Sequence, residues 1–103
     1  MMSARWSIDA KFGHKPEVIA QMKHWMEAIG SQIGWTHDKV RILNGSIGAL
    51  ESTIQTEVQV SDLAVLNTAW EQLATLDAHK HWAKELEPHI VSGTQRWEIW
   101  RLL

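Results

Sequence analysis

The residues best suited to chemistry gather in one stretch, LDAHKHWAKELEPHI at 76–90, which holds three histidines. A metal site needs about three protein ligands, so the cluster invites that interpretation. On a helix, however, positions two apart point about 200° apart, and His79 and His81 cannot reach one ion. His81 and Glu85 are four residues apart, which favours an ordinary surface pair. The spacing therefore predicts no metal site.

His79 is the histidine that remains a candidate for catalysis. It shares a helical face with Trp82 and Ala83, an apolar neighbourhood that would lower its pKa and keep the ring neutral. A neutral ring could act as a general base or as a hydrogen-bond donor toward an oxygen. A histidine that only satisfies a backbone carbonyl at a helix end explains the same pattern. His89, which follows Pro88, is expected to cap a helix end.

Tryptophan dominates the aromatic content, with seven tryptophans, one phenylalanine and no tyrosine. Each adds a large apolar surface and an N–H that needs a partner. Five fall on the expected inner faces of different elements and are candidates for binding a substrate: Trp6, Trp25, Trp70, Trp82 and Trp97. Aromatic walls with few polar groups suit a flat, hydrophobic small molecule. The same rings could instead fill the core completely, and the sequence leaves both interpretations open.

Composition and charge narrow the class of protein. A chain of 103 residues is expected to form one domain over 1–103. The net charge is −2 and the basic residues are scattered, which argues against a nucleic-acid partner. No apolar run approaches the roughly 18 residues that span a bilayer, so no membrane association is expected. The absence of cysteine excludes disulfides and thiolate ligands and fits a cytoplasmic location.

The strands that would position these residues follow from alternation of polar and apolar side chains. The clearest alternation covers 50–60, and a second covers 5–12. Shorter strands are expected over 39–43 and 95–102. Four strands are therefore predicted.

Two long helices are predicted between these strands. Apolar residues recur at helical spacing from Val18 to Ile33, after Pro16, and predict about five turns. Asp62 is a good N-cap for the second helix. That helix is expected to break near Asp77, which would cap a new segment containing His79–Leu86.

The resulting order, βαββαβ, predicts an α+β, ferredoxin-like domain whose two helices cover one face of a four-stranded antiparallel sheet. The helix-facing side is expected to hold Trp6, Ile8, Ala10, Phe12, Val40, Ile42, Leu50, Ile54, Val58, Val60, Trp97 and Ile99. The other face is expected to hold Arg5, Asp9, Lys11, Arg41, Leu43, Thr53, Gln55, Glu57, Arg96, Glu98, Trp100 and Leu102. Both charge signs and several apolar residues on that second face favour a two-fold homodimer over a solvated sheet.

Three segments carry a resemblance to the dimeric α/β-barrel superfamily, in which two ferredoxin-like subunits press their sheets together. They are the glycine-punctuated run KVRILNGSIG at 39–48, the alternating strand at 51–60 with the following SDL, and HKHW at 79–82 with Pro88 and His89. The chain is most similar to the NIPSNAP-like branch, with the antibiotic-biosynthesis monooxygenase-like branch second. The resemblance implies a pocket in each subunit, between sheet and helices, with His79 at the position of a pocket histidine.

A fold of this kind does not determine activity. The resemblance implies a small-molecule-binding protein, as a cofactor-independent oxygenase or isomerase acting on a hydrophobic or aromatic compound. The alternatives are a non-catalytic dimeric module and, more weakly, a haem-binding protein. The haem-degrading branch uses a pocket asparagine on the first strand with a tryptophan and a histidine. Trp70 and His79 could supply the last two, but the first strand offers Ser7 and Asp9 and no asparagine. No cofactor is therefore expected, and the sequence leaves open whether the protein is an enzyme.

Overall fold

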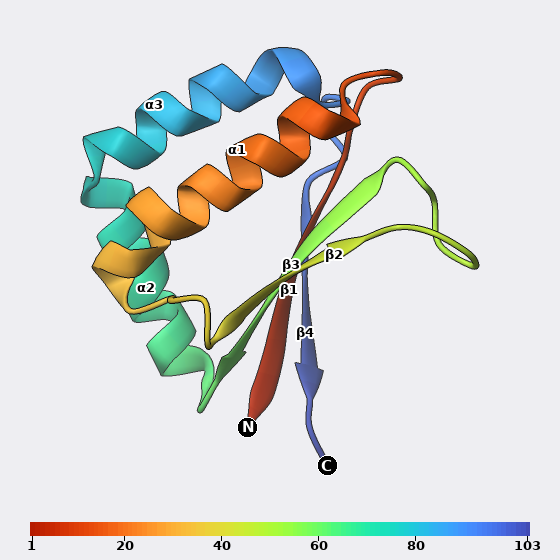
Figure 1. The fold of residues 1–103 in the computed structure, drawn as a ribbon. Helices are drawn as coiled ribbons and strands as arrows, with labels where there is room; N and C mark the ends of the chain where they lie inside the picture. Colours follow the sequence, from red (N-terminus) through yellow and green to blue (C-terminus); the bar gives the residue numbers. More distant parts are fainter.

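The computed structural model describes residues 1–103 as one four-stranded sheet with three α-helices (Figure 1). The strands are β1 (Met2–Asp9), β2 (Val40–Asn44), β3 (Thr53–Val60) and β4 (Arg96–Arg101). The helices are α1 (Lys15–Ala28), α2 (Leu63–Thr75) and α3 (Asp77–Leu86), with 3-10 turns at Gly30–Ile33 and Glu87–His89. The strands pair antiparallel in the order β2-β3-β1-β4. The predicted ferredoxin-like fold is confirmed.

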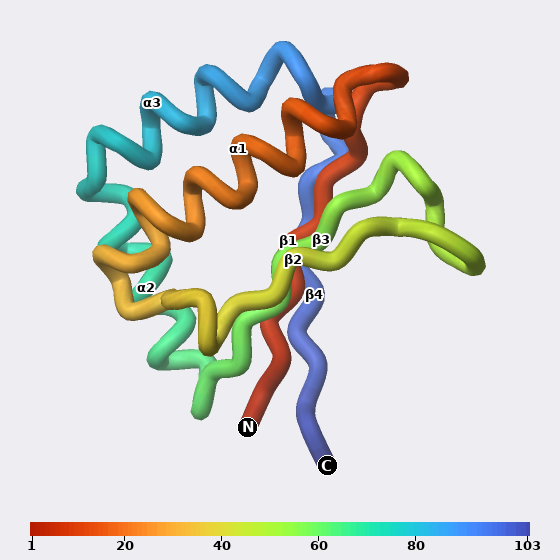
Figure 2. The backbone as a smooth tube through the Cα atoms, in the orientation of Figure 1, coloured from red at the N-terminus to blue at the C-terminus, as the bar shows by residue number.

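The molecule has two layers, with all three helices on one face of the sheet and no chain over the other face (Figure 1). The two ends of the chain lie side by side (Figure 2), where the amide of Leu102 donates to the carbonyl of Met1 over 3.0 Å. No helix combines the length and the apolar character that crossing a bilayer requires. Because all three helices lie on one face of the sheet, the core lies between the helices and that inner face.

The second predicted helix is two helices, α2 and α3, as the expected break near Asp77 implied. Asp62 caps α2, because its Oδ1 accepts a bond from the amide of Val65 over 2.9 Å. The break itself falls at Leu76, whose backbone is extended at φ −90° and ψ 114°. The expectation that Asp77 caps α3 is wrong: Asp77 is the first helical residue, where its charge still suits the positive helix end.

The first helix is shorter than the predicted five turns. α1 ends at Ala28, and Gly30 begins a 3-10 turn that Gly34 closes with a φ of 79°. A Cβ on Gly30 would lie 2.9 Å from the Trp25 ring and 2.9 Å from the carbonyl oxygen of Trp35. Gly30 thus permits a close approach that brings Trp35 back against the core.

Three residues expected on the helix-facing side lie outside the strands, and two of them, Phe12 and Leu50, are exposed whereas Ala10 is buried. β1 ends at Asp9, with only a bridge from Ala10 to Ile90 beyond it, and Phe12 is fully exposed. β3 begins at Thr53, and Leu50 is exposed in the β2–β3 turn, where its carbonyl accepts from the amide of Thr53. At the end of β1 and at the start of β3, the alternation of polar and apolar residues extends beyond the residues whose backbones pair with a neighbouring strand.

The inner face of the sheet is not covered evenly. α1 packs against β2 and α2 packs against β3, and the fully buried core residues include Ile8, Ile54 and Leu66. On β4, Trp97 and Ile99 point to the helix side as expected but stay partly exposed. The helix side of the sheet is therefore open near β4.

Candidate functional site

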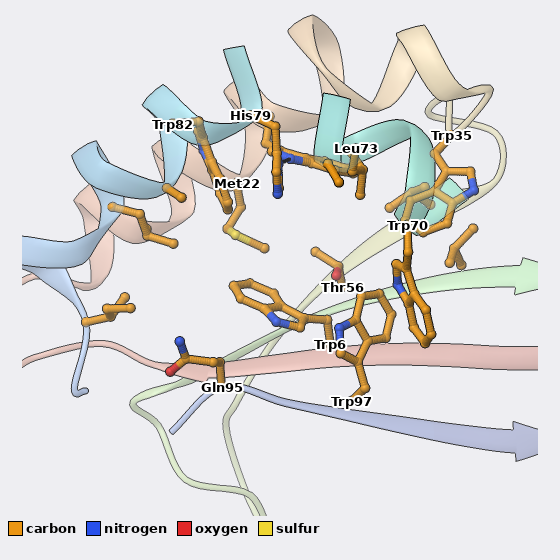
Figure 3. Close-up of a pocket in the computed structure, with 17 residues that line it drawn as sticks. Trp6, Met22, Trp35, Thr56, Trp70, Leu73, His79, Trp82, Gln95 and Trp97 are labelled. Carbon is orange, nitrogen blue, oxygen red and sulfur yellow. Dashed lines mark hydrogen bonds between the residues drawn. The ribbon is translucent and has the colours of Figure 1, made fainter. Parts of the chain in front are cut away.

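A cavity of about 390 Å³ lies between the helices and the sheet (Figure 3). Small-molecule pockets typically measure roughly 300 to 1,000 Å³, so the cavity can hold a compact ligand. Of its 17 lining residues 14 are hydrophobic, and none is Lys, Arg, Asp or Glu. Six of the seven tryptophans line it: Trp6, Trp25, Trp35, Trp70, Trp82 and Trp97. These include all five that the sequence singled out.

The tryptophans divide into a buried wall and an entrance. Trp25, Trp35 and Trp82 are buried, and the ring of Trp25 lies 6.1 Å from each of the other two. Trp70 on α2 and Trp97 on β4 are 37% and 38% exposed. Their rings meet edge to face at 5.3 Å between centroids, as Figure 3 shows. The entrance to the cavity therefore lies between α2 and β4.

His79 projects from the first turn of α3 into this apolar space (Figure 3). Its ring stacks on that of Trp82, with 5.7 Å between centroids and 20° between planes. The indole Nε1 of Trp25 donates a hydrogen bond to His79 Nδ1 over 3.0 Å. An indole N–H can only donate, so Nδ1 must accept, and the neutral ring carries its proton on Nε2.

The surroundings of His79 keep its ring neutral. Desolvation by burial lowers the pKa of His79 below its usual value, as its apolar helical face predicts. A proton on Nδ1 would also face the indole N–H of Trp25, so that two donors would meet with no acceptor between them. With its proton on Nε2 the ring is a hydrogen-bond donor toward the cavity, and it has no free lone pair there for general-base catalysis. Of the two roles that the sequence allowed, the geometry favours the donor.

Replacing His79 with phenylalanine is expected to reduce the pH dependence of stability below about pH 6.5. The unfolded chain protonates this histidine before the folded chain does, because burial lowers the pKa in the folded state. The stabilisation from the neutral ring is therefore complete above pH 6.5 and is lost as pH falls through the lower folded pKa. Urea unfolding between pH 7.5 and pH 5 measures this slope.

The matched control is His81→Phe, because His81 is exposed on the same helix and pairs with Glu85 over 2.9 Å. This variant should keep the wild-type slope. An unchanged slope in His79→Phe would contradict a neutral, desolvated His79.

The position of α3 depends on Trp82 as well as on His79. Trp82 Nε1 donates to the backbone carbonyl of Gln21 over 2.8 Å and so links α3 to α1. The ring of Trp6 from β1 lies 6.4 Å away. Trp82 therefore joins both helices to the sheet at the back of the cavity.

Several lining residues have no counterpart in the sequence predictions. Trp35 reaches the cavity because Gly30 and Gly34 fold the chain back after α1. Thr56 had a detectable signal, because it occupies an even, inward position of the 50–60 alternation. Gln95 lies just before β4 in the structure, but it also had a signal, because in the predicted strand over 95–102 it alternates in step with the inward-facing Trp97 and Ile99.

The other histidines lie away from the cavity. His81 and Glu85 form the expected surface pair. His89 does not cap a helix as expected; its Nδ1 lies 2.9 Å from Nδ1 of His14, in the segment before α1. No three histidine, aspartate or glutamate side chains gather in an arrangement that could hold a metal ion.

Haem, the weaker alternative from the sequence, does not fit the hydrogen bonding of His79. Iron binding through Nε2 would use its lone pair and move the ring proton to Nδ1. That proton would then face the N–H of Trp25 at a contact of 3.0 Å. The indole N–H of Trp25 needs an acceptor at Nδ1, and this requirement disfavours iron ligation by His79.

Comparisons with known proteins place the fold. No protein-family model and no curated protein matches the sequence. The structure is similar to a NIPSNAP family protein from Agrobacterium tumefaciens, with a TM-score of 0.77 and 17% identity over 99% of this chain and 90% of that chain. It is also similar to a putative antibiotic biosynthesis monooxygenase from Nitrosomonas europaea, with a TM-score of 0.68 and 9% identity over 100% and 99%.

A third similar structure is a dimeric protein of unknown function and ferredoxin-like fold from Bacteroides fragilis. Its TM-score is 0.65, with 15% identity over 98% of this chain and 96% of that chain. At such identities the likeness defines the fold alone. The chain has the ferredoxin-like fold that NIPSNAP and antibiotic-biosynthesis monooxygenase proteins share, and the expected resemblance is confirmed at that level.

Proposed function

We propose that the protein binds a flat, uncharged, mainly apolar small molecule in the tryptophan-lined cavity, and that His79 donates a hydrogen bond from Nε2 to an oxygen of that ligand. The observation that carries the proposal is the bond from Trp25 to His79 Nδ1, which orients a donor into an apolar space with room for a ligand. The lining offers no charged side chain to a charged ligand. Burying an unpaired charge is costly, so an uncharged ligand is favoured.

In the catalytic version of this function the protein is an oxygenase or isomerase that uses no cofactor. The Nε2 proton of His79 would stabilise negative charge that develops on a substrate oxygen. The tryptophan rings would hold the substrate in one orientation. The likeness in fold to a putative antibiotic biosynthesis monooxygenase supports this version. A non-catalytic binding module would use the same cavity for affinity alone.

The proposal includes a homodimer formed through the open face of the sheet, in the cytoplasm. Leu43 and Trp100 are exposed on that face, and burying them would stabilise an association. The description of one protein with this fold as dimeric also supports it.

Equilibrium dialysis with fluorene and 9-fluorenone tests the donor, because the two probes have nearly the same flat shape and only the second has a carbonyl oxygen. We expect both to bind, and fluorenone to bind about tenfold more tightly, the effect of one buried hydrogen bond. In His79→Phe the two affinities should become equal, whereas His81→Phe should keep the difference. Equal affinities in the wild-type protein would contradict the donor role, and binding of neither probe would contradict the cavity as a ligand site.

A further inference from the structure

The indole of Trp25 is held in one orientation by its neighbours. Its ring lies 6.1 Å from the rings of both Trp35 and Trp82, tilted at 52° and 56° to them. Gly30 packs so closely against the indole that an added Cβ would lie 2.9 Å from the ring, and Trp25 is only 8% exposed. A side chain enclosed in this way keeps one rotamer, so its N–H stays directed at His79.

The imidazole of His79 is fixed in both its plane and its polarity. Stacking on Trp82, with 20° between the ring planes, sets the plane. The bond from Trp25 Nε1 sets the polarity, because it makes Nδ1 the acceptor and leaves the proton on Nε2. A half-turn of the imidazole would move Nδ1 away and leave the buried indole N–H without a partner, which is unfavourable.

Two other polar side chains line the cavity, and neither is bonded to His79. Thr56 lies on β3 and Gln95 lies just before β4, so both are on the sheet side, whereas His79 is on the helix side (Figure 3). A hydroxyl and an amide can each donate and accept, but His79 in this tautomer can only donate. The cavity is therefore selective for hydrogen-bonding type at one point, on the side of α3.

We infer that Trp25 determines the hydrogen-bond specificity of the cavity: through His79 it selects a ligand with an acceptor oxygen facing α3 and denies a bond to a ligand that offers a donor there. The inference rests on the proposed donor role of His79 and adds the residue that imposes it and the class of ligand group that is refused. The carbonyl of a flat ketone fits, whereas an aromatic N–H meets the Nε2 proton. Trp25 is thus a positioning residue that acts through His79.

Without the indole donor this specificity should relax. A neutral imidazole carries its proton on either nitrogen, and here the partner of Nδ1 decides between them. In Trp25→Phe, His79 can keep the proton on Nε2 for a ketone, or move it to Nδ1 and accept a bond from an N–H ligand. Phenylalanine keeps an aromatic ring between Trp35 and Trp82, so the wall of the cavity is retained.

Equilibrium dialysis with 9-fluorenone and carbazole tests the inference, because these flat tricyclic molecules are similar in size and offer a carbonyl and an N–H at the same position. Wild-type protein should bind fluorenone about tenfold more tightly, the difference that one buried hydrogen bond makes. In Trp25→Phe the ratio should fall to about threefold or less, because each probe can then form one bond. His79→Phe gives the ratio that contacts other than His79 produce.

The matched control is Trp35→Phe. Trp35 is also buried, lines the same cavity and packs against Trp25, but it makes no bond to His79. This variant should keep the wild-type ratio of the two affinities. Circular dichroism confirms that each variant is folded.

The tautomer of His79 is read directly by ¹⁵N NMR at slightly alkaline pH, because protonated and bare ring nitrogens resonate far apart. The signal that His79→Phe lacks identifies His79. Wild-type protein should carry the proton on Nε2 with either probe, whereas Trp25→Phe with carbazole should carry it on Nδ1. A purely structural role of Trp25 would alter stability without altering the tautomer.

A wild-type His79 that moves its proton to Nδ1 when carbazole binds would overturn the role of Trp25, and this measurement needs no variant at position 25. A ratio that stays at the wild-type value in Trp25→Phe would overturn it as well, and would leave the His79 donor in place. Equal binding of fluorene and fluorenone by the wild-type protein would instead overturn the donor on which the inference rests.

Discussion

Replacing Trp82 with alanine is expected to lower the free energy of unfolding by about 3 to 5 kcal/mol, the range for truncating a large buried aromatic. Trp82 is buried between α3, α1 and β1, stacks on His79 and bonds to the carbonyl of Gln21. Alanine would remove the ring and leave that carbonyl without its indole donor. The space left behind would merge with the existing cavity, so the neighbouring side chains would lose contacts that water cannot replace well.

Trp70→Ala is the matched control, because Trp70 lines the same cavity but lies at its entrance and is 37% exposed. The same change there should cost about 1 to 2 kcal/mol, because much of the ring already contacts water. Urea unfolding at fixed protein concentration, followed by circular dichroism, gives both values. Equal losses in the two variants would contradict a structural role specific to Trp82.

Replacing Glu57 with alanine is expected to lower the free energy of unfolding by about 1 to 3 kcal/mol, because it leaves two guanidinium groups without their shared carboxylate. Glu57 accepts from Arg5, Arg41 and Ser3 on the open face. Both arginines keep some access to water, which sets the loss below that for breaking a fully buried pair. Unfolding at neutral pH measures the loss, and Glu57→Gln, which keeps the shape and one acceptor, should cost less.

Glu57 also predicts a specific sensitivity to acid. Hydrogen bonding from Arg41, with a further bond from Ser3, holds the pKa of this carboxyl below its ordinary value of 4.5. The stabilisation is therefore present above pH 4.5 and is lost as pH falls through the lower folded pKa. In Glu57→Gln the loss of stability below pH 4.5 should be shallower than in the wild-type protein. If the wild-type protein and Glu57→Gln lost stability equally below pH 4.5, the carboxylate of Glu57 would add no stability to the folded state.

The fold could be predicted from the sequence because the signals for it are local. Strands follow from alternation and helices from three-to-four spacing, and both patterns reflect burial on one face of an element. The Asp62 cap and the break before α3 depend on neighbouring residues in the same way. The predicted strand boundaries were wrong where a strand ends because no neighbouring backbone remains to pair with it. Phe12 continues the β1 alternation, yet its backbone lies beyond the last residue that pairs.

The candidate site was predictable in part. The five tryptophans and His79 were identified because each lies on the inward face of its own element. Whether their rings would fill the core or leave a cavity depends on how the helices are spaced over the sheet, and α1 and α2 leave the side near β4 open. Trp35 reaches the cavity through a turn whose direction no periodicity encodes.

The sequence by itself determined the order of the elements, the inward faces, and His79 as the histidine in apolar surroundings. Only the tertiary structure decided what His79 can do, because its tautomer depends on Trp25, which is 54 residues away in the chain. Likewise, the sequence put arginine and glutamate on the outer face, but the strand register aligned them into one row. Burial follows from the type and spacing of neighbouring residues, whereas hydrogen-bond direction and cross-strand alignment depend on contacts between distant segments.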